Sequence, residues 1–169
     1  MKTERFTLLI ILLFIRGFAF SQIAENFSDG DFYNSPHWEG NYNSFIINPD
    51  HVLQLDAAES GRAALWIPTT FIGDEMEWKM SVKMDCNPSA NNFVRIYLLS
   101  DSANLSAAPK RAFFLQFGEN QSNDAIELFF EDKNRLISIC RGTNGLIANP
   151  FEMNIKVIRN RNYEWAIWV

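Results

Sequence analysis

The stretch EWKMSVKMDC, residues 77–86, alternates apolar and polar side chains along its whole length. Its apolar positions are Trp78, Met80, Val82, Met84 and Cys86. A period of two places successive side chains on opposite faces of an extended strand. The pattern predicts a β-strand that buries one face in a core and presents the other to solvent.

Several other segments also have the character of strands. Residues 151–157 alternate in the same way. Four further segments are rich in the aromatic and β-branched residues that strands favour: 93–99, 112–117, 125–130 and 163–169. Residues 135–141 carry apolar side chains on both faces, which predicts a short strand covered on both sides.

Turn-forming residues separate the expected strands. Asn, Asp, Gly and Pro gather at positions 29–30, 48–50, 87–89, 142–145 and 149–150. No segment of a dozen residues has the 3.6-residue period of an amphipathic helix. Short strands punctuated by turns predict an all-β fold, an antiparallel sandwich or barrel. Because no internal repeat or linker-like tract interrupts it, we expect one domain over residues 22–169.

The N-terminus has the features of a secretory signal peptide in their usual order. Lys2 and Arg5 precede an apolar run at 6–15, and small residues lead to an expected cleavage after Ser21. This ten-residue run, broken only by Thr7, is too short to cross a bilayer, which needs about 20 residues. We expect residues 1–21 to be an export signal, the alternative being a buried N-terminal helix. The protein is then periplasmic, at the outer-membrane surface or extracellular, with no transmembrane segment.

Composition and charge exclude several classes of protein. The chain is 47% hydrophobic and has two cysteines, which excludes a disordered chain and a disulfide-built miniprotein. The expected signal contains three of the 15 basic residues and one of the 20 acidic ones, so the net charge falls from −5 to −7 on its removal. An acidic chain lacks the basic patch of a nucleic-acid-binding protein, so nucleic acid is not an expected partner.

The last segment, YEWAIWV at 163–169, places apolar side chains on both faces up to the final residue. We expect both faces of this strand to be buried. Terminal residues are usually poorly ordered unless they are tied down. The pattern therefore favours a fragment of a longer protein, in which the sandwich is incomplete. The alternative is a strand that pairs centrally and ends the chain.

The two cysteines have two interpretations. Cys86 lies on the apolar face of its expected strand, whereas the direction of Cys140 is ambiguous, because isoleucines occupy the opposite face. Export permits a disulfide between them, provided that the two Cα atoms lie within about 7 Å. The alternative, which we favour, is that both are small buried apolar residues. His37 and His51 stand alone beside turns, so neither a zinc site nor a Cys-His catalytic pair is expected.

Acidic residues are frequent between positions 119 and 132. A glycoside hydrolase needs two carboxyl groups about 5–10 Å apart across the scissile bond. Laminarinase-type enzymes carry the pattern Glu-x-Asp-x-x-Glu, and Asp124 and Glu127 match its second half, but Ser122 stands at the first position. We therefore favour a polar turn that leads into an alternating strand over a catalytic pair.

Two oxygen-rich turns are candidates for calcium. Asp29 and Asp31 flank a glycine, and Asn123 and Asp124 form the other turn. Calcium takes six to eight oxygen ligands, more than either turn specifies. Solvated turns are the favoured interpretation, and no other cofactor is expected.

One sheet face is a candidate for ligand recognition. If the aliphatic residues of 93–99 and 125–130 point into the core, their neighbours point outward. These outward residues are Arg95, Tyr97, Gln116, Glu127 and Phe129, joined by Arg141 if Cys140 points inward. Aromatic rings and fixed polar groups on one surface suit the binding of a sugar. A face covered by loops or a neighbouring domain is the alternative.

Several motifs resemble a known family. ENFSDGDFYNSPHWEG at 25–40, NPSANN at 87–92, SNDAIEL at 122–128 and ICRGTNGLIA at 139–148 are similar to the N-terminal module of large secreted Bacteroidetes surface proteins. The resemblance implies a concanavalin A-like jelly-roll sandwich, often followed by lamin-tail domains and by strands beyond the position of Trp168. Cys86 departs from it, since an aromatic residue is expected there.

Together these features predict a secreted or cell-surface, non-catalytic module that binds polysaccharide or presents neighbouring domains of the same chain. One alternative is a polysaccharide hydrolase or lyase of concanavalin-like fold, with Arg95, Tyr97, Gln116 and Glu127 in its cleft. Another is a purely structural domain of a larger surface protein.

Overall fold

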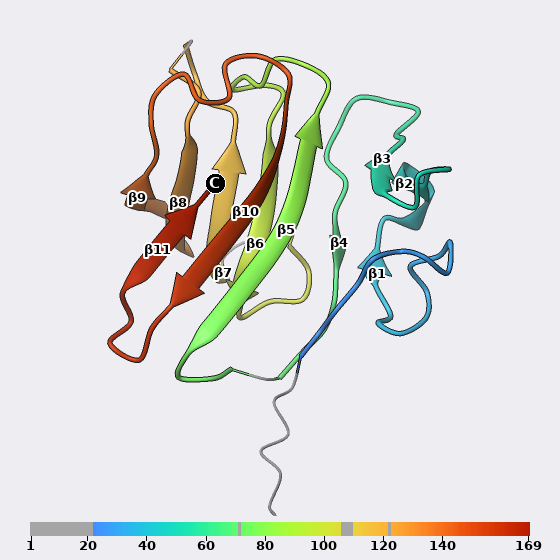
Figure 1. Ribbon diagram of the computed structural model, residues 1–169, viewed down its shortest axis with the longest axis horizontal. Helices are drawn as coiled ribbons and strands as arrows, with labels where there is room; N and C mark the ends of the chain where they lie inside the picture. The colour runs from blue at the N-terminus through green and yellow to red at the C-terminus, as the bar shows by residue number, and fades with distance from the viewer. Residues whose placement is uncertain (1–21, 71, 106–109, 122) are drawn as a thin grey trace, which may run out of the picture.

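The computed structural model describes residues 22–70, 72–105, 110–121 and 123–169 (Figure 1). The expected signal peptide at 1–21 lies outside these ranges, and so does Ser122. Within them, no helix is long and apolar enough to span a lipid bilayer.

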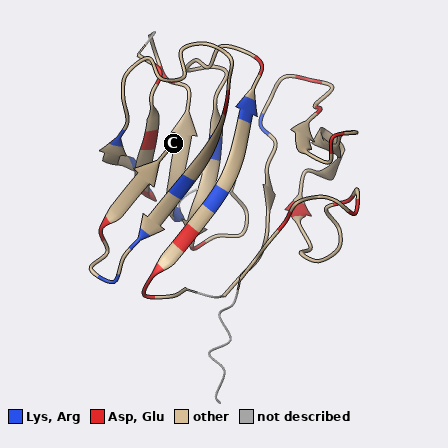
Figure 2. Ribbon diagram, viewed as in Figure 1, with Lys and Arg blue, Asp and Glu red and all other residues tan. Residues whose placement is uncertain are grey.

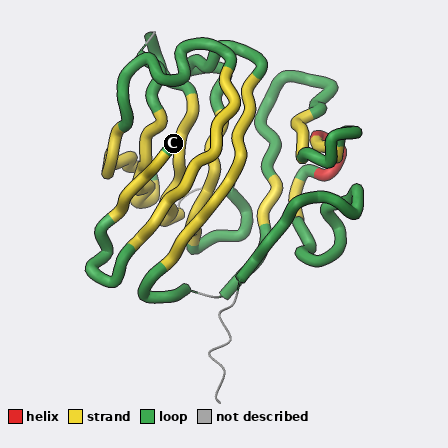
Figure 3. Tube along the Cα trace, viewed as in Figure 1, coloured by secondary structure: helices red, strands yellow, loops and turns green. Residues whose placement is uncertain are grey.

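Two antiparallel sheets form the body of the protein (Figures 1 and 3). One sheet has the order β6-β7-β8-β9, made of Val94–Ser100, Lys110–Phe117, Ile126–Lys133 and Arg135–Arg141. The other has the order β11-β10-β5, made of Trp165–Trp168, Phe151–Arg159 and Met76–Met84. All pairs of neighbouring strands are antiparallel. The expected all-β, antiparallel sandwich is therefore confirmed.

A smaller region precedes β5 and contains elements that the sequence did not reveal. Its two-stranded sheets are β1 (Glu39–Gly40) with β4 (Leu65–Trp66), and β2 (Phe45–Ile47) with β3 (Leu53–Leu55). A single 3-10 turn, Tyr42–Ser44, joins β1 to β2. Figure 1 shows this region beside the β5 edge of the sandwich.

The core lies between the two large sheets. It is one cluster of buried side chains from both layers: Val82, Met84, Leu98, Leu115, Phe117, Ile126, Leu128, Ile147, Ile155 and Val157. The alternating stretch that begins at residue 77 supplies two of them, so its predicted inward face is confirmed as far as Met84. Burial of apolar surface in this cluster is what joins the two sheets.

The outer face of the three-stranded sheet is charged, as the polar positions of 77–86 predict. Figure 2 shows basic and acidic positions along β5 and β10. Lys79 and Lys156 lie opposite each other, and both form ion pairs with Glu77. Hydrogen bonds from Lys79 and then Lys156 lower the pKa of the Glu77 carboxyl. This face therefore has the solvated character of an ordinary protein surface.

The interpretation of 135–141 as a strand covered on both sides is wrong. β9 is an edge strand, and Leu136 and Ile139 are 47% and 43% exposed. Its register shifts by one residue, because Leu128 pairs with Cys140 whereas Phe129 pairs with Ser138. Ile139 is thus the extra residue of a β-bulge. The bulge interrupts the alternation, which is why neither face appears polar in the sequence.

Expectations at the ends of two other strands also need correction. β5 ends at Met84, and Cys86 is exposed rather than buried on an apolar face. β11 begins only at Trp165 and forms an edge of its sheet, so it is not a central strand. Its faces are not both buried, because Trp168 is 50% exposed.

Candidate functional site

The six residues proposed for ligand recognition lie on one face, the outer face of the β6-β7-β8-β9 sheet. Four of them form a continuous cross-strand row, in which Arg95 pairs with Gln116, Gln116 with Glu127, and Glu127 with Arg141. We call these four residues the polar row. Arg141 was expected on this face only if Cys140 points inward, and Cys140 does pack against the core.

A second row lies one outward position further along the strands. Tyr97 pairs with Phe114, and Phe114 pairs with Phe129. The ring centroids are 5.0 Å apart in the first pair and 5.6 Å apart in the second. These three residues, called the aromatic row, form a ladder of neighbouring rings, in which Tyr97 is tilted against Phe114 and Phe129 is stacked on it. Phe114 in the middle is completely buried, whereas Tyr97 and Phe129 on either side are partly accessible.

Arg95 is held in place mainly by contacts with its ring neighbours. Its Nε donates to Oε1 of Gln116 at 2.9 Å. Its guanidinium lies 4.5 Å from the ring centroid of Phe114 and 5.2 Å from that of Phe93. Stacking of this kind fixes a guanidinium while leaving its terminal amino groups available. Among the described residues, Arg95 has no carboxylate partner within salt-bridge distance.

Arg141 has the opposite character, since its donors are all engaged. Its terminal nitrogens donate to both oxygens of Glu119, at 2.5 and 3.0 Å, and one of them donates to Glu127 at 2.5 Å. Asn144 and the carbonyl oxygen of Asn123 accept further bonds. The hydrogen bond to Glu119, followed by that to Glu127, raises the pKa of Arg141, so it remains charged. It therefore organises the face rather than offering a free cation.

Glu127 has both carboxylate oxygens occupied. Ser138 Oγ donates to Oε1 at 2.5 Å, and Arg141 donates to Oε2. The side chain is 13% exposed. Glu127 is thus held by Ser138 and paired with Arg141, the arrangement of a charge-assisted pair within the face.

The second carboxylate of the laminarinase-like pattern does not join this face. Asp124 precedes β8, is buried, and accepts a hydrogen bond from the backbone N–H of Glu119 at 3.1 Å. It therefore fixes the turn between β7 and β8. The favoured interpretation of this segment, a polar turn leading into an alternating strand, agrees with these positions.

The residues considered for calcium also serve their own turns. Asp31 accepts bonds from Asn34 Nδ2 and from the backbone N–H groups of Tyr33 and Asn34, and these bonds, the Asn34 side chain first, lower its pKa. Asp29 accepts one from the Asp31 backbone. The carbonyl oxygen of Asn123 accepts from Gly145 and Arg141. Within the described ranges, no three His, Cys, Asp or Glu side chains are grouped to hold a metal ion.

Both cysteines are free thiols. Cys86 lies beyond the end of β5, where its sulfur accepts a hydrogen bond from Asn92 Nδ2 at 3.2 Å. Cys140 is partly buried and packs against the core. The alternative of two small buried apolar residues is thus right for Cys140 and wrong for Cys86.

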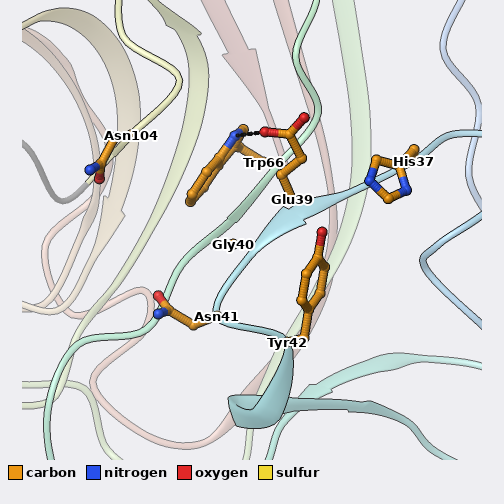
Figure 4. A pocket seen from close by; sticks show the side chains of 7 residues that line it. All are labelled: His37, Glu39, Gly40, Asn41, Tyr42, Trp66 and Asn104. Carbon is orange, nitrogen blue, oxygen red and sulfur yellow. Dashed lines mark hydrogen bonds between the residues drawn. The ribbon is translucent and has the colours of Figure 1, made fainter.

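A pocket of about 630 Å³ lies outside the sheet face, at a place where no site was predicted (Figure 4). Its walls come from the smaller region and from the loop after β6, and the lining residues are His37, Glu39, Gly40, Asn41, Tyr42, Trp66 and Asn104. The strands that build it are two residues long, too short for alternation to be visible. A glycine between polar residues, followed by an isolated tryptophan, was the one available signal.

No protein-family model matches this chain, and searches of curated proteins and of solved structures found no significant match. Function therefore has to be inferred from the side chains and their arrangement.

Proposed function

We propose that this protein is a secreted or cell-surface β-sandwich module, without catalytic activity, that binds glycans on the outer face of its four-stranded sheet. The observation that carries the proposal is the pairing of the polar row with the aromatic row. Partly accessible rings beside fixed hydrogen-bonding groups are suited to a sugar, which has apolar C–H faces and a rim of hydroxyl groups.

The two rows offer complementary chemistry. Tyr97 and Phe129 supply ring surface, and Arg95 supplies amino groups that no described carboxylate neutralises. Side chains that are already held lose little conformational freedom when a ligand binds. The resemblance to Bacteroidetes surface modules, with the jelly-roll topology and export that it implies, supports the same proposal.

Replacing Tyr97 by leucine tests the binding face. We expect affinity for a bound polysaccharide to fall about tenfold, because truncating a central aromatic contact costs more than about 1 kcal/mol. Affinity electrophoresis in gels containing individual polysaccharides identifies a ligand, and titration calorimetry then gives the affinities of the full chain and its variants.

Tyr163→Leu is the matched control. Tyr163 is 69% exposed in the turn between β10 and β11, on the other sheet. Its replacement should change the affinity less than twofold. Equal losses in the two variants would contradict the assignment of the sheet face. If no polysaccharide retards the wild-type protein, a structural role is the better description.

The enzymatic alternative makes a separate prediction about Glu127. We expect the wild-type protein to release neither reducing ends nor unsaturated products from the polysaccharide that it binds, because Glu127 is paired with Arg141 and Asp124 is buried in a turn away from it. Reducing-sugar assays and absorbance near the ultraviolet band of unsaturated uronates measure this. An activity that is present in the wild type and lost in Glu127→Gln would establish the hydrolase or lyase instead.

A domain-presenting role is the second candidate, and exposed apolar side chains favour it. Leu136 and Ile139 on β9 and Trp168 on β11 are each at least 43% exposed. β9 and β11 are edge strands of the two sheets and lie on the same side of the sandwich in Figure 1. Apolar groups gathered along one side are typical of contact surfaces between domains.

A further inference from the structure

The pocket beside β1 and β4 has the size of a small-molecule site. Its volume of about 630 Å³ falls within the range of about 300–1,000 Å³ found for ligand pockets. It is formed by segments far apart in the chain, because β1 pairs with β4 and Asn104 comes from the loop after β6. It uses no residue of the polar or aromatic row.

Trp66 is fixed as an aromatic wall of this pocket. Its indole Nε1 donates to Oε2 of Glu39 at 3.2 Å, as Figure 4 shows. The ring also lies against β1 at Gly40, where an added Cβ would be 2.9 Å from Cζ3 of Trp66 and 2.2 Å from the carbonyl oxygen of Ala64. Gly40 has φ +131°, a conformation that only glycine adopts readily. A glycine is therefore needed for the ring to take this position.

Tyr42 supplies a second aromatic group. Its hydroxyl donates to the carbonyl oxygen of Trp38 at 2.9 Å. Trp66 and Tyr42 are both partly buried, and each is held through its polar end. The Tyr42 ring also packs on Phe32 and Tyr33, with centroids 6.0 and 5.2 Å away. Tyr42 therefore forms a fixed wall, and Trp66 supplies the ring surface for a ligand.

Three lining side chains keep hydrogen-bonding capacity after their internal bonds are counted. Asn41 uses Oδ1 to accept from the backbone of Ala64 at 2.9 Å, which leaves its amide donors. Glu39 uses Oε2, which leaves Oε1 as an acceptor. His37 Nδ1 lies 2.6 Å from the carbonyl oxygen of Tyr33, to which it donates, and this leaves Nε2 for a further hydrogen bond. None of these remaining atoms has a partner among the described residues.

The charge of the lining selects the class of ligand. Glu39 is the one carboxylate there, and the described lining contains neither lysine nor arginine. An anionic ligand would meet repulsion without a compensating cation. A ligand with an apolar face, adjacent donors and acceptors and no negative charge fits this combination.

We propose that this pocket binds a neutral sugar ring, stacked on Trp66 and hydrogen-bonded through its hydroxyl groups to Glu39 and Asn41. The ligand class is that of the proposed function, but the site is separate from the sheet face. A protein with both sites would hold one glycan at two points or two glycans at once.

The test follows the indole N–H signals of the full chain by NMR during titration with neutral and acidic disaccharides. The neutral set is cellobiose, lactose, mannobiose, xylobiose and chitobiose, and the acidic probe is digalacturonate. Loss of a signal in Trp66→Phe assigns the Trp66 resonance. We expect a saturable shift of that resonance with at least one neutral disaccharide, and binding at least tenfold weaker with digalacturonate.

Variants then locate the ligand. Trp66→Leu should weaken binding of the neutral disaccharide at least tenfold, whereas Trp168→Leu, a matched change at an exposed position of β11, should leave it within twofold. Tyr97→Leu should also leave it unchanged, so failure of the sheet-face proposal is distinguishable from failure of this one. No shift with any neutral disaccharide, or an equal shift with digalacturonate, would overturn the proposal even if Trp66→Leu does not fold.

Discussion

Lys110→Met is expected to destabilise the protein by about 3–5 kcal/mol, because it leaves a carboxylate without its cation in a buried place. Lys110 and Glu131 form an ion pair of 3.3 Å on the outer face of the four-stranded sheet, where both side chains are covered and only 6% and 11% exposed. The Lys110 ammonium also lies 5.7 Å from the ring centroid of Tyr97. Oε2 of Glu131 is buried with no hydrogen-bond partner, so it has no other group to compensate for the loss.

The double variant Lys110→Met, Glu131→Leu shows whether the loss comes from the unpaired Glu131 carboxylate or from the missing contacts of Lys110 itself. Replacing both members of a buried ion pair by apolar residues of similar size is often neutral or stabilising, unlike removal of one. We expect the double variant to recover most of the lost free energy of unfolding, measured by urea denaturation. If the double variant is no more stable than the single one, the stranded carboxylate is not the cause.

Phe117→Ala should cost about 3–5 kcal/mol, the usual cost of emptying a phenylalanine site in a core. Phe117 is fully buried, belongs to the cluster between the sheets, and stacks on Phe151 of β10 with centroids 6.0 Å apart. The cavity would lie where the two layers meet. The substitution therefore weakens contacts between the sheets as well as within one of them.

Thermal unfolding monitored by circular dichroism measures the effect of Phe117→Ala. A domain of this size should lose about 6–20 °C in Tm. Ile72→Ala is the control, because Ile72 is 69% exposed and such changes usually stay within about 0.5 kcal/mol. If Phe117→Ala had the same Tm as Ile72→Ala, contacts other than those of Phe117 would hold the two sheets together.

The fold was predictable wherever a long strand keeps a regular alternation. Residues 77–86 and 151–157 predict the inward positions of β5 and β10, and these positions form one side of the core. The short strands β1 to β4 escaped prediction, because two or three residues show no period. The pairing of β1 with β4 also joins residues more than 20 positions apart, and the Ala64 N–H donates to Asn41 Oδ1 across the same distance in sequence.

The sheet-face residues could be predicted because alternation also specifies which residues point away from a core. Arg95, Gln116 and Glu127 follow from that rule alone, and the cross-strand register places them side by side. Their hydrogen-bond partners do not follow from it. Glu119 approaches Arg141 from a loop, and loop positions depend on the whole fold rather than on local pattern. The same holds for the pocket at Trp66.

The bulge at Ile139 allows two side chains at an odd spacing along β9 to donate to the same carboxylate, that of Glu127. Ser138 and Arg141 are three positions apart, and in a regular strand they would face opposite sides. The bulge accommodates the extra residue and brings both onto Glu127, with each donating to a different oxygen. If the strand kept its length but lost the bulge, one of the two side chains would turn to the core face. Deleting Ile139 would instead leave Ser138 and Arg141 two positions apart, a spacing that keeps both on the outer face of a regular strand. The contacts of Glu127 should therefore survive the loss of the bulge when Ile139 is deleted with it.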